Sequence, residues 1–260
     1  MIKFFRRIRQ QLLGEGKTGK YLKYALGEIL LVMIGILLAL QVNNWNTNIT
    51  NQKEEQLILR AFHQELVYNF SKIEEKKLWC EDIKSAIMEL LEIDKLELDN
   101  YPKASIDTLI GRISWFTNTT IEMSVADAII IGGKLSLMNN ENLRFLITEW
   151  ARNVDNVRDT EKQDYDAFKD FWMPYLQEHG YIAQISNSIT KKPGVEERNY
   201  ATIVPTKLNP LDHSVLLASR EFHNILLRRL WIMDDIIYHN DLILPKLEKL
   251  IESISLELGE

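Results

Sequence analysis

The chain has 260 residues, of which 46% are hydrophobic and 26% charged, enough for one anchoring segment and one folded domain. Its 6 prolines and 11 glycines favour long helices over a loop-rich β fold, and the single cysteine, Cys80, excludes an internal disulfide. The net charge of −6 conceals a strongly basic head at residues 1–24, a pattern that points to a membrane surface or a nucleic acid.

Residues 1–23 are expected to form a basic amphipathic segment. The stretch IKFFRRIRQQLL places apolar side chains on one helical face and Arg6, Arg7 and Arg9 mostly on the other. Such a face suits the anionic inner leaflet of a lipid bilayer. Because an apolar run follows, a nucleic-acid partner is not expected.

Residues 24–46 are predicted to form one transmembrane helix. Residues 25–42 carry one charge, and an 18-residue helix spans roughly 27 Å, close to the hydrocarbon thickness of a bilayer. Tyr21, Tyr24 and Trp45 flank the run, as interfacial aromatic residues do. The basic residues of the head all precede it, so the positive-inside rule places residues 1–23 in the cytoplasm and the body across the membrane.

Two other interpretations of this run remain open. A cleaved signal peptide would need small residues at a cleavage site, but the run ends in ALQVNNWN, with bulky or amide side chains there. A buried helix of a soluble protein is the second alternative, because the uninterrupted apolar core from Ile29 to Leu40 is short. The one-sided basic flank favours the transmembrane interpretation over both.

The charge within the run belongs to Glu28, near its cytoplasmic end. A helical wheel predicts a contact face toward another membrane helix, made of Gly27, Glu28, Leu31, Gly35 and Ala39. The pair of small residues four positions apart in this face allows two helix backbones to approach closely. Alternatively, Glu28 is a boundary residue whose carboxylate reaches the headgroups instead of another helix.

The opening of the chain resembles a known family. The stretches IKFFRRIRQQLL and KYLKYALGEILLVMIGILLALQVNNWN, and more weakly VADAIIIGGKLSLMNNENLRFLITEW in the middle, resemble an uncharacterised family of single-pass membrane proteins from Bacteroidota. The resemblance implies an uncleaved anchor in the inner membrane of a Gram-negative cell and a helical periplasmic part. That family has no established activity, so it supplies no catalytic residue.

Residues 47–260 are predicted to form a periplasmic helical domain, which makes the chain all-α with an extramembrane bundle of long helices. The first expected elements are a long helix over 48–93, a short helix over 105–114 capped by Ser105, and a helix from Thr119 or Thr120 to Ile131 ended by Gly132 and Gly133. A long helix over 140–179 follows, which Pro174 kinks or interrupts. The chain then forms a long loop near 181–212, which binds a partner or is mobile, and a last helix over 214–258 divided by Pro245.

No catalytic, cofactor-binding or metal-binding residue is predicted. The histidines lack paired-ligand spacing, and Asp235 with His239 and Asp241 is read as a solvated helix end rather than a metal site. Cys80 lies on the apolar seam of its helix and is expected to pack as a small hydrophobe. The tryptophans beyond the anchor are expected in the core, although a few of them would suit a ligand pocket between helices.

The sequence therefore favours a single-pass inner-membrane protein whose periplasmic domain is an interaction or scaffold module. Its expected partners are the bilayer, a second copy of the chain or an envelope protein. The alternative is a periplasmic ligand-sensing or regulatory subunit that signals through a partner, because the short basic head leaves no room for an output domain. An enzyme is the third class, and no motif supports it.

Overall fold

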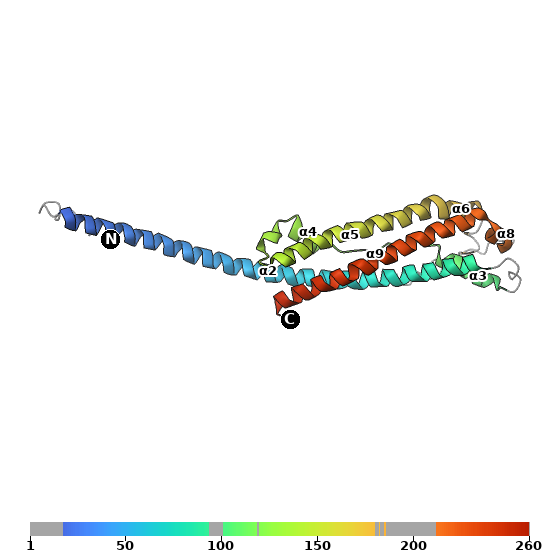
Figure 1. Ribbon diagram of the computed structural model, residues 1–260, viewed down its shortest axis with the longest axis horizontal. Coiled ribbons are helices and arrows are strands. Elements are labelled where there is room, and N and C mark those ends of the chain that lie inside the picture. Colours follow the sequence, from blue (N-terminus) through green and yellow to red (C-terminus); the bar gives the residue numbers. More distant parts are fainter. Residues whose placement is uncertain are drawn as a thin grey trace. The chain divides into compact units, whose positions relative to one another are not determined.

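The computed structural model describes residues 18–93, 101–118, 120–179, 182, 185 and 212–259. Every regular element within these ranges is a helix, as the composition predicted (Figure 1). The chain divides into two compact units, Met1–Leu57 and Ile58–Glu260, which are described separately.

Helix α2 (Thr18–Glu92) is continuous over 75 residues and contributes to both units. The expected helix over 48–93 is thus part of a longer one that includes the apolar run. No proline interrupts it, and its glycines are confined to the first unit. Most of the predicted basic segment, including Arg6, Arg7 and Arg9, lies outside the described residues.

Within the second unit, α2, α5 (Glu141–Ala167) and α9 (Arg220–Leu258) carry the core. Their buried residues recur at alternating steps of three and four, which keeps one face of each helix on its neighbours. On α2 the predicted apolar seam is confirmed: its buried members are Leu59, Phe62, Leu66, Ile73, Cys80, Ile83, Ile87 and Leu90.

Side-chain pairs fix how α9 runs against its neighbours. Lys77 on α2 pairs with Asp241 at 2.6 Å, and Lys84 pairs with Asp234 at 2.5 Å, so residue numbers rise on one helix as they fall on the other. The same reversal holds against α5, where Glu149 accepts a hydrogen bond from Lys246 at 2.8 Å and Asp164 pairs with Arg229 at 3.6 Å. Helix α9 is therefore antiparallel to both α5 and the second-unit part of α2 (Figure 1).

The two short helices after α2 begin elsewhere than predicted. Helix α3 (Lys103–Arg112) starts directly after Pro102, and Ser105 lies inside its first turn without capping it. Helix α4 (Ser124–Ile130) starts four residues or more after the predicted threonines, because a carboxylate from α2 caps it. The predicted end is close: α4 is followed by Gly133 at φ 72°, a left-handed conformation that glycine adopts without strain. A short 3₁₀ helix, η2 (Lys134–Leu137), follows.

The expected helix over 140–179 forms as three segments in one line. The side chain of Asn140 caps α5, a π-helical segment η3 (Phe168–Trp172) follows, and α6 (Met173–Glu178) completes it. Pro174 explains the π segment, because proline lacks the N–H that an α-helix requires and its ring crowds the preceding turn. The α-helical hydrogen-bond pattern thus changes just before Pro174, but the chain stays helical through Glu178.

The last predicted helix was wrong in two respects. Ser219 separates α8 (His213–Ala218) from α9, because its backbone is extended and its hydroxyl accepts a hydrogen bond from the Phe222 amide. Pro245, expected to divide the helix, lies inside α9. It is exposed, so the carbonyl that it leaves without an amide partner faces solvent.

Two apolar cores occupy the second unit. One joins the α2 residues from Trp79 onward to α3, α6, α8 and the first half of α9. The other joins Leu59–Ile73 of α2 to α4, the first half of α5 and the second half of α9. The predicted loop near 181–212 falls almost wholly outside the described residues, although Ile185 is buried in the first core.

Candidate functional site

The apolar run of α2 is uncovered on every side. Among the described residues, α2 is the one helix long and apolar enough to cross a membrane, and none of its most apolar 18-residue window is buried. The large side chains from Ile29 to Val42 point in all directions around the helix, and all of them are exposed. From Leu59 onward the same helix instead alternates buried and exposed residues.

The predicted contact face lies on this uncovered stretch. Leu31 and Ala39 are exposed, Glu28 is half-buried, and a side chain added at Gly27 or Gly35 would meet no atom within 4 Å. All five residues thus project from one helix, and whether they meet another helix stays a prediction.

The predicted interface residues are only partly described. Trp45 is exposed at the far end of the run, whereas Tyr21 and Tyr24 fall within α2 but their side chains lie outside the described residues. At the end of the run the helix turns polar: Gln41, Asn44 and Asn48 join Leu37, Leu40 and Trp45 in lining a shallow groove along one side of it. This change from apolar to amide side chains is the kind of boundary that a bilayer interface requires.

A buried ion pair lies in the second unit. Asp164 of α5 and Arg229 of α9 are 0% and 1% exposed, with 3.6 Å between Oδ1 and Nη2. Asp164 Oδ2 accepts hydrogen bonds from the amide and hydroxyl of Thr117, at 2.6 and 2.9 Å. Arg229 donates to the carbonyls of Ile113 and Trp115. Burial lowers the pKa of Arg229, and the Asp164 carboxylate opposes this effect.

More polar side chains are buried between the two apolar cores. Lys76 of α2 donates to Glu161 of α5 at 2.7 Å. Asn240 of α9 is fully buried, and neither atom of its amide has a hydrogen-bond partner among the described residues. Burial raises the pKa of the nearby Cys80 thiol to about 12, which makes it a poor nucleophile. Lys76 with Glu161 and Asp164 with Arg229, together named the polar cluster, thus pair across α2, α5 and α9.

A second set of polar contacts holds α4 against α2. The Glu65 carboxylate accepts hydrogen bonds from the amides of Val125 and Ala126, at 2.7 and 3.1 Å, at the N-terminus of α4. Asn69 donates to the Glu122 carbonyl at 2.8 Å and accepts from its amide at 2.9 Å. Burial raises the pKa of Glu65 above its usual value, although the two amide donors oppose the shift.

The residues considered for a metal site on the last helix have different partners. Asp235 and His239 lie 3.6 Å apart as an i,i+4 pair, while Asp241 points to Lys77. Within the described part of the chain, no group of three or more His, Cys, Asp or Glu side chains could hold a metal ion.

Sequence reasoning missed most of these polar contacts. Asn69 and Lys76 fill gaps in the apolar seam of α2, and their partners lie 53 and 85 residues away. The available signal was that a polar residue at a seam position must find a hydrogen-bond partner. Trp231 was expected in the core with the other tryptophans but is 69% exposed.

Comparison with known proteins places the chain in a family. A model of a family of unknown function (DUF6090) matches residues 28–158, half of the chain, and the chain belongs to that family. The match takes in most of the apolar run, the second-unit part of α2 and the middle segment with α4 and much of α5. No curated protein and no solved structure shows a significant match.

Proposed function

We propose that this protein is a single-pass inner-membrane protein whose helical body, on the periplasmic side, is an interaction module for an envelope partner. One observation carries the proposal: the large apolar side chains of Ile29–Val42 are uncovered on every side of α2. A half-exposed side chain of this size forfeits roughly 1 kcal/mol in water, so the whole run strongly favours an apolar surrounding. A helix in lipid meets this demand, because its own hydrogen bonds satisfy its backbone.

Three further facts support the anchor and its orientation. The seven basic residues of the head precede the run, which favours a cytoplasmic N-terminus. The ALQVNNWN stretch has bulky or amide side chains where an Ala-x-Ala cleavage site would be. The family match starts at residue 28, inside the run, and extends to residue 158, which favours an apolar segment retained with the body. A bundle of long helices, packed through seams of period 3.5, would then present its outer surface to partners.

Extraction of membranes at alkaline pH tests the anchor. The full chain should stay in the membrane pellet at its full mass, whereas Ile34→Arg, near the middle of the run, should release the chain or lead to its degradation. Leu57→Arg is the matched control, because Leu57 is also exposed on α2 but lies beyond the run, and it should leave the chain in the pellet. Release of the wild-type chain by alkaline washing would overturn the proposal.

The contact face is the part of this proposal that concerns self-association. Gly35→Ile should weaken association of full chains in a membrane two-hybrid assay by about 1–2 kcal/mol at most, because it fills the close approach that glycine permits. Leu37→Ile, on the other side of the same helix, is the control and should have no effect. Equal signals from both variants and the wild type would mean that the face contacts lipid.

A further inference from the structure

The outward side of α9 carries a line of large apolar side chains. Leu227, Trp231, Tyr238 and Leu242 are 37%, 69%, 59% and 47% exposed, and their spacing of four, seven and four places them on one side of the helix. The buried residues of α9 occupy the other side. We name these four residues the outer α9 face.

This face has the dimensions and composition of a docking surface. It extends over 16 residues, so its length is roughly 22 Å, which matches about four turns of a partner helix. Tryptophan and tyrosine are the side chains that contribute most to binding at protein interfaces. Single exposed apolar residues need no explanation, but four large ones on one side of a helix are typical of an interaction site.

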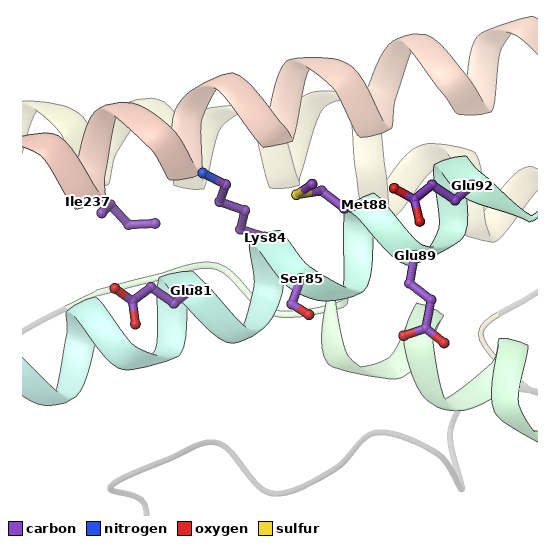
Figure 2. Close-up of a pocket in the computed structure, with 7 residues that line it drawn as sticks. All are labelled: Glu81, Lys84, Ser85, Met88, Glu89, Glu92 and Ile237. Carbon is purple, nitrogen blue, oxygen red and sulfur yellow. The ribbon is translucent and has the colours of Figure 1, made fainter.

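Carboxylates border the face. Asp234, Asp235 and Asp241 flank it on α9 itself. Beside it, a groove of about 470 Å³ is lined by Glu81, Glu89 and Glu92 of α2 and by Ile237 of α9. Figure 2 shows Glu81 near Ile237, whereas Glu89 and Glu92 lie further along α2 and Glu89 points away from α9.

Ion pairs neutralise part of this border. Lys77 and Lys84 pair with Asp241 and Asp234, and Arg228 lies 4.1 Å from the ring centroid of Phe171. The carboxylates named here still outnumber these cations, so the border of the apolar strip keeps a net negative charge.

We propose that the outer α9 face binds a basic amphipathic helix of another protein. Such a helix would cover Trp231 and Tyr238 with its apolar side and would place lysines or arginines against the bordering carboxylates. The charge argues against two other occupants. A bilayer with anionic lipids would repel the carboxylate border. A second copy docked through the same face would bring the aspartates at its middle, Asp234 and Asp235, against each other.

The test uses the full chain in nanodiscs of zwitterionic phosphatidylcholine and two fluorescent 18-residue peptides. The peptides share one leucine pattern and differ in the polar face, which carries lysine in one and glutamate in the other. Fluorescence anisotropy should show binding of the lysine peptide, with at least tenfold weaker binding of the glutamate peptide. The double variant Trp231→Ala/Tyr238→Ala should weaken binding of the lysine peptide at least tenfold. Ile131→Ala, a change at an exposed apolar side chain outside this face, should leave it unchanged.

Each contrary result overturns the proposal in a recognisable way. Equal binding of the lysine and glutamate peptides, or equal binding of the lysine peptide to the wild type and to the double variant, would show that the outer α9 face does not bind such a helix. Dimerisation that the double variant abolishes would assign the face to a second copy. Quenching of fluorescence by brominated lipid that Trp231→Phe removes would assign it to the bilayer. The inference rests on the proposed role as an interaction module, and it can fail while alkaline extraction still leaves the chain in the membrane, so the two failures are distinguishable.

Discussion

Asp164 on α5 and Arg229 on α9 are both fully buried, and together they hold the backbone of the segment that joins α3 to α4. Arg229 donates to the carbonyls of Ile113 and Trp115, while Asp164 accepts from Thr117. One ion pair thus connects two long helices and the chain between two short ones. Removal of one partner would leave the other charge buried without compensation.

Arg229→Met should therefore destabilise the full chain by about 3–5 kcal/mol, read from urea unfolding in detergent micelles. The double variant Asp164→Leu/Arg229→Met should cost less than Arg229→Met alone, because no isolated charge remains. Arg228→Met is the neighbouring control, and loss of its contact with Phe171 should cost about 1 kcal/mol or less. Equal costs for Arg228→Met and Arg229→Met would contradict this view of the pair.

Two buried asparagines give a matched comparison. Asn69 exchanges two hydrogen bonds with the backbone of Glu122, so Asn69→Leu should cost about 1–3 kcal/mol. Asn240 is equally buried, and its amide has no partner among the described residues, so Asn240→Leu should leave stability unchanged or raise it by about 1 kcal/mol. The same urea experiment measures both. A larger loss for Asn240→Leu than for Asn69→Leu would show that Asn240 has a binding role that these contacts do not account for.

Glu65 should make the stability of the folded chain depend on pH. Burial raises its pKa in the folded chain above the value of 4.5 for a free side chain. A carboxyl group with a raised pKa binds a proton more tightly when folded, so its contribution to stability is greatest below pH 4.5 and declines as pH rises through the raised pKa. Relative to Glu65→Gln, the wild-type chain should therefore lose stability as pH rises above 4.5. The check is urea unfolding at a series of pH values, and an identical pH slope in both proteins would rule the effect out.

Cys80 should report unfolding of the body. Its thiol is fully buried, and its pKa is raised to about 12, so a thiol reagent at pH 8 should label the folded chain very slowly. In urea the same thiol should react at the rate of an exposed cysteine. Rapid labelling of the folded chain would mean that α2 opens locally around this residue.

The sequence pattern predicted those parts of the fold that depend on local spacing. The seam of α2 from Leu59 to Leu90 and the effect of Pro174 follow from helical period and backbone chemistry. The boundary at Ser219 was also a local signal, because serine followed by Glu221 favours a new helix start, but continuous helical spacing outweighed it. Pro245 does not end α9 as predicted, because its exposed position lets solvent compensate for the lost hydrogen bond.

The rest of the fold and the polar contacts depend on residues that are distant in the sequence. No local pattern pairs Glu65 with the start of α4, or Lys76 with Glu161, across 60 and 85 residues. Periodicity also fails to distinguish the inner side of α9 from its outer side where both carry apolar residues, and this explains the wrong placement of Trp231. The polar cluster was thus beyond sequence reasoning, whereas the apolar run was identifiable from composition alone.

The position of the C-terminus relative to the membrane tests the central proposal most directly. Two fusions after Glu260 are required: one reporter that is active only in the periplasm, and one that is active only in the cytoplasm. We expect activity of the periplasmic reporter alone, on a chain of full mass in the membrane fraction, because the basic residues before the run hold the N-terminus in the cytoplasm. Activity of the cytoplasmic reporter after Glu260 would contradict it.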